Sequence, residues 1–339
     1  MPLPRCCAPV FCPSCALPMT KKKIADKQWR ILSAVPAPPI PSSAKKTSQV
    51  KITGTTQVQD TDPPSAAAAA GADSHLGTGF HAKVSIDIRW SRFHILTAED
   101  EAMREKALRL RHDVFLHEIL GRSSDTLVDQ DDFDDICDHL LILEAASLRP
   151  VGTYRFISSS FSQRFYTQTE FDLGNLLNSP GDKLEMGRAC IHPEFRNGFT
   201  FIALWKGLAG YISRHRVSRL FGCSSINNTD PATIAAIQDY LQRHDYVDDS
   251  YGCQPLPTFR LAGLVDAQRQ VQSLSLTERV ANDGYIEAMI PPLLWAYLEA
   301  GAKVVSSPAY DADFACMDFL TVLNTDRLRD DLVRKYKPW

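Results

Sequence analysis

Apolar and polar positions follow regular patterns from Val84 onward. Val84, Ile86 and Ile88 alternate with polar residues, which predicts a short strand. Across residues 98–117 the apolar side chains recur every three to five positions, and acidic side chains occupy the first turn, where the helix dipole favours them. We therefore predict a helix there. The acidic stretch 129–135 shows neither the alternation of a strand nor the recurrence of a helix, which predicts a loop.

The rest of the body is predicted to consist of strands interrupted by helices. We expect strands at 139–144, 151–157, 183–192, 218–224, 302–306 and 317–323, and helices at 200–215, from Pro231 onward and at 292–300. Asp230 is suited to cap the second helix, and Gly301 to end the third. Residues 244–290 show no clear period. This order predicts an α+β (mixed α/β) fold, with a central, mostly antiparallel sheet flanked by helices in one domain over residues 83–337.

The first 82 residues differ in composition from this body. Residues 1–80 contain 11 of the 21 prolines and the alanine run 66–70. Nine lysines and arginines against four aspartates give them a formal charge of +5, which leaves −8 for the remainder of a chain whose total is −3. Such a segment cannot supply a core. We predict a disordered leader over residues 1–82 and expect deletion of residues 1–75 to leave activity intact.

Several classes of protein are excluded by these features. No apolar run approaches the roughly 18 residues of a membrane-spanning helix. An acidic body argues against nucleic-acid binding, which requires clustered Lys and Arg. The nine cysteines are odd in number and no secretory signal is evident, which favours reduced thiols and a cytoplasmic location. Cys12 and Cys15 have zinc-ligand spacing, but no second pair or nearby His completes a site, so we expect no metal.

The segment after the third predicted strand has the form of an anion site. Arg188 lies in the strand, Arg196 and Gly198 lie in the turn, and Thr200 begins a strongly apolar helix. Free backbone N–H groups and the positive end of the dipole at a helix N-terminus favour a bound phosphate. Many α/β proteins have such a turn without a ligand, so this pattern alone is weak.

With these motifs in place, the chain resembles the GNAT acyltransferase superfamily, and within it the hemolysin-like ornithine acyl-ACP N-acyltransferases. The resemblance spans roughly residues 90–335. It is carried by Glu185-Met-Gly-Arg188, His192-Pro-Glu-Phe-Arg196, Leu204-Trp-Lys-Gly-Leu208, Phe221-Gly-Cys-Ser224, Pro291-Pro-Leu-Leu294, Tyr297-Leu298, Gly301-Ala302, Asp311, Phe314 and Asp318. It implies a GNAT-like fold and the first step of ornithine lipid synthesis. In that step a 3-hydroxyacyl group passes from acyl carrier protein to the α-amine of L-ornithine, giving lyso-ornithine lipid, with no cofactor besides the acyl thioester.

Part of the pattern is also similar to acyl-homoserine-lactone synthases. The shared positions are Arg111-His-Asp-Val-Phe115, Asp129, Asp131, Asp134, Arg155, Phe171, Glu185 and Arg188. Two departures are evident: that family usually has Glu where Asp129 stands, and its tryptophan after the Arg-Phe motif is absent. Another N-acyl amino acid synthase, an acyl-homoserine-lactone synthase and a non-catalytic acyl-carrier or membrane-binding module therefore stay open as alternatives.

The resemblance suggests Glu185 and Arg188 as the catalytic residues. The acceptor amine must lose a proton before it attacks, and a carboxylate can accept that proton directly or through water. Glu185 is our candidate base, and backbone N–H groups after it, at a bulge, would stabilise the oxyanion. The structural alternative is an ion pair between Glu185 and Arg188. Buried Cys190 and Cys223 have no helper histidine in the sequence, so we expect direct transfer.

The resemblance also suggests how the acceptor is held. Asp129, Asp131 and Asp134 would bind its ammonium groups, and Arg111 and Arg155 would clamp its carboxylate. The alternatives are that the acidic loop is a solvated turn and that Arg111, which lies partly inward on its helix, only holds this loop in place.

On the donor side, Arg196, Gly198 and Thr200 would hold the phosphopantetheine arm. The turn lacks the second glycine that GNAT proteins normally have, since Phe199 follows Gly198. Arg214 and Arg216 form a basic patch that we expect to dock the acidic carrier protein. The apolar helices 200–212 and 291–300 would wall an acyl pocket, and the same surfaces would permit peripheral contact with a membrane.

Overall fold

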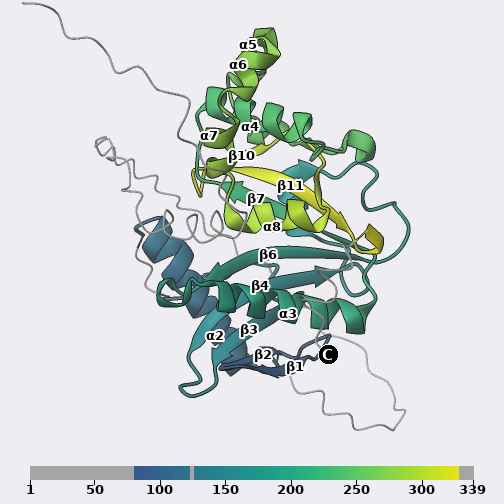
Figure 1. Cartoon of the computed structure of the whole chain (residues 1–339). Helices are drawn as coiled ribbons and strands as arrows, with labels where there is room; N and C mark the ends of the chain where they lie inside the picture. The colour runs from purple at the N-terminus through teal and green to yellow at the C-terminus, as the bar shows by residue number, and fades with distance from the viewer. Residues whose placement is uncertain (1–79, 123–125, 328–339) are drawn as a thin grey trace, which may run out of the picture.

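The computed structural model describes residues 80–122 and 126–327. Residues 1–79 of the predicted leader (1–82), its Cys12–Cys15 pair and residues 328–337 of the predicted domain lie outside the described residues. Figure 1 shows one central sheet with helices on both sides. None of the described helices is long and apolar enough to cross a membrane.

Nine strands form the main sheet. They are β1 (Asp87–Trp90), β2 (Phe93–Thr97), β3 (Asp138–Glu144), β4 (Pro150–Ser158), β6 (Lys183–Ile191), β7 (Arg219–Ile226), β9 (Lys303–Val304), β10 (Ala309–Asp311) and β11 (Cys316–Asn324). Their order is β1-β2-β3-β4-β6-β7-β11-β10, with β9 also paired to β11. The β6–β7 pair is parallel and the other pairs are antiparallel. The prediction of a mixed, mostly antiparallel sheet flanked by helices is confirmed. Two short strands, β5 (Phe171–Asp172) and β8 (Gln254–Pro255), form a separate pair.

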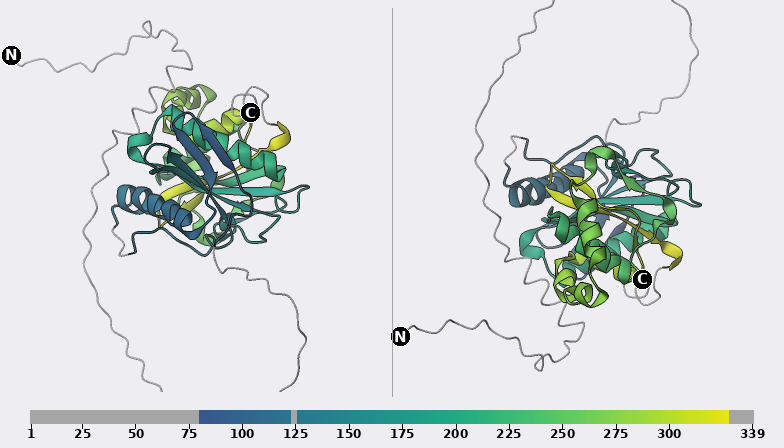
Figure 2. Two further views of the ribbon diagram at one scale, coloured as in Figure 1. Left: turned by 90° about the horizontal axis from the view of Figure 1, so that it is seen from below. Right: turned by 90° about the horizontal axis from the view of Figure 1, so that it is seen from above.

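Helices cover both faces of the sheet (Figure 2). The α-helices are α2 (Glu101–Arg111), α3 (Gly198–His215), α4 (Pro231–Arg243), α5 (Leu264–Ser273), α6 (Leu276–Val280), α7 (Asp283–Met289) and α8 (Pro292–Ala300). A π-helix η1 (His112–Ile119) continues α2, and the 3₁₀ turns are η2 (Tyr166–Thr169), η3 (Pro193–Phe195), η4 (Asp249–Tyr251), η5 (Pro257–Phe259) and η6 (Thr325–Arg327). Leu140 and Ile142 of β3 pack in the core beneath α3, and the alternate residues Leu141 and Leu143 pack with α2. Helices α2 and α3 therefore lie on opposite faces.

Several predicted boundaries are wrong. The strand predicted at 84–88 is replaced by a hairpin of β1 and β2, whose turn places Ser91 at a positive φ of 54°. No glycine or asparagine marks that turn, so the pattern did not reveal it. The helix predicted at 98–117 begins after its cap, Asp100, and becomes the π-helix η1 after Arg111. Residues 244–290 form short helices and turns, and β10 was not predicted.

Candidate active site

The parallel strands β6 and β7 separate halfway along their length. Their last paired residues are Glu185 and Phe221, and beyond them β6 pairs only with β4 and β7 only with β11. At the start of the gap the two backbones approach so closely that a Cβ on Gly222 would lie 2.2 Å from the carbonyl oxygen of Met186. Glycine is therefore required at 222, and the split begins there.

A β-bulge lies on β6 just beyond this split. The pairing of β4 with β6 shifts between Thr153 and Arg155, so that Tyr154 stands opposite two residues, Arg188 and Ala189. Arg188 has a positive φ of 53°, which costs energy for a residue with a side chain. A bulge takes backbone groups out of the ladder and turns them toward the side of the strand. The bulge predicted after Glu185 is confirmed, and it lies at the edge of the split.

The split opens a cavity of about 300 Å³. Its apolar half lies on the α3 face of the sheet and includes Tyr154, Met186, Leu293, Leu294 and Tyr297. Its polar half lies on the opposite face and includes Tyr166, Thr167, Glu185, Arg188, Cys223, Asp311 and Asp318. A single cavity therefore passes through the sheet between β6 and β7, with different chemistry at its two ends.

Three arginines pair with Asp129, Asp131 and Asp134 of the acidic loop 129–135. Arg111 bonds Asp129 at 2.8 Å and Asp134 at 2.6 Å. Arg155 bonds Asp131 at 2.6 Å and lies 3.3 Å from Asp134. Arg188 bonds Asp131 at 3.2 Å and lies 3.7 Å from Asp129. We call these six residues the paired cluster.

The electrostatics of the paired cluster are those of a structural network. Burial by itself would raise the pKa of the Asp134 carboxyl, but Arg111 and Arg155 outweigh burial and hold this pKa well below its usual range. Arg111 is completely buried, so it has no face for an acceptor carboxylate. The alternative prediction that Arg111 holds the acidic loop is confirmed. The predicted carboxylate clamp of Arg111 and Arg155 is not formed, because both guanidinium groups are bonded to aspartates. Asp134 is neither free to bind an ammonium group, as predicted, nor part of a solvated turn, as the alternative held.

Glu185 lies at the junction of the two halves of the cavity. Its carboxylate accepts hydrogen bonds from the backbone N–H groups of Tyr166, at 2.7 Å, and Thr167, at 2.5 Å, and from the Thr167 hydroxyl. Burial raises the pKa of Glu185, and these bonds only partly offset that rise. Arg188 pairs with the acidic loop instead of Glu185, so the predicted structural ion pair is wrong.

A second group of carboxylates lies at the polar half, with Asp311 and Asp318 in the wall of the cavity. Glu170, Asp311 and Asp318 come from three different segments, and we call them the unpaired cluster. Atoms of Glu170, Asp318 and the Cys223 thiol lie within 4.8 Å of one another, as do those of Asp311, Asp318 and the Cys316 thiol. Ser225 donates to Asp318 at 2.5 Å. Among residues 80–122 and 126–327, none of the three carboxylates has an ion-pair partner within 4 Å.

Burial and mutual repulsion raise the pKa values of Glu170 and Asp318. The pKa of Glu170 rises to about 9, first because it is buried and then because the Asp318 carboxyl is beside it. Burial likewise raises the pKa of Asp318, although the Ser225 hydroxyl opposes the rise. Near neutral pH, Glu170 therefore keeps a proton and hydrogen-bonds to its neighbour.

Sequence reasoning missed the unpaired cluster as a site. Glu170 follows the short turn η2 and belongs to no periodic pattern, while Asp311 and Asp318 were noted only as part of a family motif. One signal was available: Asp318 is a lone carboxylate inside the apolar run of β11, where only a functional or paired charge is expected.

The thiols near the cavity are not activated as nucleophiles. Burial raises the pKa of Cys190 to about 12 and that of Cys223 well above its usual value. Thiolates are the nucleophilic form of cysteine, and burial disfavours them here. A third close grouping, Asp134 with Cys137 and His139, has its aspartate bonded to arginines.

The predicted donor residues fall into two separate places. At the start of α3, the Asn197 side chain caps the N–H groups of Phe199 and Thr200, and Arg196 forms a bidentate pair with Glu118 at 2.6 Å. Gly198 is exposed with open space above it. This end of α3 follows β6 and lies toward the split.

Arg214 and Arg216 are exposed at the other end of α3. A helix of 18 residues is about 27 Å long, so this patch lies far from the bulge. The predicted docking of a carrier protein there is not supported by the geometry. The predicted membrane contact through helices 200–212 and 291–300 stays a prediction: Leu204, Leu208 and Leu298 are buried in the core, whereas Phe201, Ile202 and Leu293 are only partly buried.

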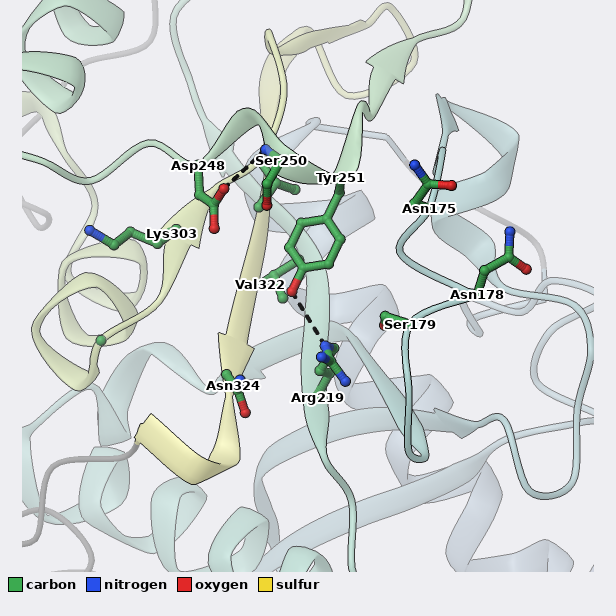
Figure 3. A pocket seen from close by; sticks show the side chains of 12 residues that line it. Asn175, Asn178, Ser179, Arg219, Asp248, Ser250, Tyr251, Lys303, Val322 and Asn324 are labelled. Carbon is green, nitrogen blue, oxygen red and sulfur yellow. Dashed lines mark hydrogen bonds between the residues drawn. The ribbon is translucent and has the colours of Figure 1, made fainter.

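A larger cavity, of about 450 Å³, lies near the other ends of β7 and β11 (Figure 3). Arg219 within it bonds the Tyr251 hydroxyl at 3.3 Å and the carbonyl of Pro180, and Lys303 pairs with Asp245 at 2.9 Å. Its two cationic side chains are therefore already bonded to protein groups. None of the residues that line it has a strained backbone conformation. The split cavity is the better candidate for chemistry.

The chain is similar to known acyltransferases. Residues 110–206 match the family model described as an acetyltransferase (GNAT) domain. A curated protein of Brucella abortus named L-ornithine N(alpha)-acyltransferase is 30% identical over 263 residues, covering 73% of this chain and 90% of the relative. A protein of the same name from Rhodobacter capsulatus is 30% identical over 252 residues, covering 70% of this chain and 92% of the relative. The solved structure of a CoA-dependent acyl-homoserine lactone synthase is 15% identical with a TM-score of 0.38, covering 70% of this chain and 81% of that chain.

Proposed function

The chain belongs to the L-ornithine N(alpha)-acyltransferase family and is an acyltransferase, and on this premise we propose that it transfers a fatty acyl group from acyl carrier protein to the α-amine of L-ornithine. The product is an N-acylated ornithine, the lyso form of ornithine lipid. The observation that carries the proposal is the cavity through the sheet, which is apolar at one end and lined by unpaired carboxylates at the other.

The donor thioester fits the apolar end. The acyl chain would lie among Met186, Leu293 and Leu294, and the thioester carbonyl would meet the N–H groups of the bulge around Arg188. Backbone N–H groups fixed in this way stabilise the oxyanion of a tetrahedral intermediate without reorganisation. The phosphopantetheine arm would leave past Gly198 at the start of α3, and we place carrier docking at that end of the helix rather than at Arg214 and Arg216.

The acceptor fits the polar end. Ornithine carries two amines. Its side-chain ammonium would lie beside Asp318 and Asp311 and supply the positive charge that the unpaired cluster lacks. The α-amine would then face the bulge. A buried carboxylate without a cation is costly, and a cationic ligand removes that cost. The paired cluster, in contrast, shapes the wall of this end through Arg188.

The chemistry balances within these groups. The neutral α-amine attacks the thioester carbon, a C–N bond forms, the C–S bond breaks, and the leaving thiolate takes up a proton equivalent to the one lost by the amine. In this proposal Glu185, whose pKa burial raises toward that of the amine, accepts this proton directly or through water. The acyl group arrives already activated as a thioester, so the proposal includes no further cofactor.

The proposal also includes the place of the reaction. Cys137, Cys190, Cys223, Cys253 and Cys316 are free thiols, as a reducing cytoplasm would leave them. A peripheral membrane contact for release of an amphiphilic product stays a prediction, and the exposed Phe199 at the start of α3 is one apolar side chain available for it.

The test is thiol release from acyl carrier protein by the purified protein. We expect release that depends on ornithine, with an N-acylated ornithine identified by mass spectrometry. Release that depends on S-adenosylmethionine would point to lactone synthesis, and binding without turnover to a non-catalytic module. In the same assay Glu185→Gln should lower turnover strongly while the fold persists, and an unchanged rate would remove Glu185 as the base.

A further inference from the structure

Two tyrosine hydroxyls meet in the apolar half of the cavity. Tyr154 comes from β4 and Tyr297 from α8, each is 4% exposed, and their hydroxyl groups are hydrogen-bonded to each other. Aromatic neighbours fix both rings: Trp205 lies 5.6 Å from the Tyr297 ring and Phe156 lies 5.2 Å from the Tyr154 ring, centroid to centroid. The pair is therefore a rigid polar spot on an otherwise apolar wall.

The hydrogen bonding of this pair is incomplete. Two hydroxyls carry two protons, and one hydroxyl-to-hydroxyl bond uses only one of them. Within the part of the chain that the structure describes, neither hydroxyl has another hydrogen-bond partner. Burial raises the pKa of both phenols, so both protons stay in place. A buried donor without an acceptor costs about 1–3 kcal/mol, and a ligand oxygen would relieve that cost.

The position of the pair limits which ligand oxygen it can reach. Tyr154 is the single residue opposite the bulge at Arg188 and Ala189, where the thioester carbonyl is held in the proposed function. Met186, Leu293 and Leu294 line the same half, so the occupant there is largely hydrocarbon. A hydroxyl carried by the acyl chain near its thioester end could accept the spare proton and donate to a tyrosine oxygen.

We propose that the Tyr154–Tyr297 hydroxyl pair binds a hydroxyl group on the acyl chain close to the thioester, and so selects 3-hydroxyacyl donors over unsubstituted donors of the same length. The inference rests on the proposed function, because it assigns the specificity of the same cavity. It makes the tyrosines determinants of donor choice, while the bulge and the carboxylates act on both kinds of donor alike.

The decisive variant is Y154F/Y297F, which removes both hydroxyls and keeps both rings. Replacing both partners of a buried hydrogen bond by apolar groups of the same shape is nearly neutral for stability, so the fold should persist. The measurement is kcat/KM with ornithine for 3-hydroxyacyl and unsubstituted acyl carrier protein. We expect the wild type to prefer the hydroxylated donor by about 5- to 30-fold, the equivalent of one hydrogen bond. The double variant should prefer neither, through loss of rate with the hydroxylated donor only.

A matched control is Tyr211→Phe. Tyr211 is a buried tyrosine of α3 whose hydroxyl bonds Asp138, outside the cavity, so its loss should leave the donor preference unchanged. A wild type without preference would overturn the inference, and so would a double variant that slows both donors equally, since that result assigns the pair to the thioester itself. Failure of the wild type to use either donor would instead overturn the proposed function.

Discussion

The two groups of buried carboxylates in this protein have opposite electrostatic surroundings. In the paired cluster, Asp129, Asp131 and Asp134 lie against Arg111, Arg155 and Arg188 at distances from 2.6 to 3.7 Å. In the unpaired cluster, three carboxylates of similar burial contact thiols, hydroxyls and one another. Arg155 and Arg188 of the paired cluster and Asp311 and Asp318 of the unpaired cluster line the same cavity, and the positive charge of Arg188 acts on Asp318.

The comparison separates structural charge from charge kept for a ligand. Arginine partners lower the pKa of Asp134, which means that the fold favours its charged form. The pKa of Glu170 is raised to about 9, which means that the fold alone disfavours charge there. A site that disfavours its own charge until a cation arrives is suited to bind an ammonium group. The number of acidic residues in a cluster therefore does not indicate its role. Whether the carboxylates have cationic partners in the protein does.

The largest expected effect comes from breaking the paired cluster. Arg111→Ala leaves Asp129 and Asp134 buried without their main cation, and loss of one partner of a buried pair typically costs about 3–5 kcal/mol. We expect this variant to unfold at much lower denaturant concentration or to fail to fold. Arg109→Ala is the control, because Arg109 forms an exposed pair with Glu105, and its effect should stay below about 1 kcal/mol. Equal effects of the two substitutions would contradict a structural role for the cluster.

Asp318→Asn should lower activity and not stability, in contrast to Arg111→Ala. It removes a charge that has no protein cation, so stability should be kept or slightly increased, whereas kcat/KM for ornithine should fall on the order of 100-fold, as for loss of one partner of a buried ion pair. Denaturation and steady-state kinetics on the same preparation measure both. Asp313→Asn changes an exposed carboxylate of the neighbouring turn and should alter neither. Full activity with ornithine in Asp318→Asn would remove the unpaired cluster from acceptor binding.

The contrast between the clusters shows which parts of the site could be predicted from the sequence. The order of elements could be predicted, because strand alternation and an apolar helix are local signals, whereas the bulge after Glu185 and the involvement of Arg188 were suggested only by the family resemblance. The acidic loop could be found but not interpreted, since its arginines come from positions 111, 155 and 188 and meet only in the folded sheet. Glu170 could not be found at all, because its burial depends on β11, about 150 residues away along the chain.

The pH dependence of stability tests the comparison more finely. A carboxyl whose pKa is raised on folding stabilises the protein while it is protonated, and this contribution is lost as the pH rises from its ordinary value of 4.5 to about 9 for Glu170. Asp134 has the opposite sign: its contribution is present above the ordinary pKa of 3.8 and is lost as the pH falls below that value. We expect the free energy of unfolding to fall between about pH 6 and pH 9, by at most about 1.4 kcal/mol per pH unit.

Urea denaturation across that range measures this slope, and Glu170→Gln should flatten it because no proton is then bound or released at that position. A slope that persists unchanged in this variant would assign the titration to another group.

The smallest effect concerns the contact between the two clusters. Asp131 is the least buried of the paired aspartates, with 24% of its side chain exposed, and it shares Arg188 with Asp129. Asp131→Asn should cost only about 1 kcal/mol, because Arg155 keeps Asp134 and Arg188 keeps Asp129. It also removes one negative charge near Arg188, whose positive charge already lowers the pKa of Asp318. The midpoint of the stability slope should therefore move down by a few tenths of a pH unit, as expected for one partly screened charge. A midpoint that moved up, or down by more than about one unit, would show that the two clusters titrate as a single network and that their separation into structural and ligand-binding charge is wrong.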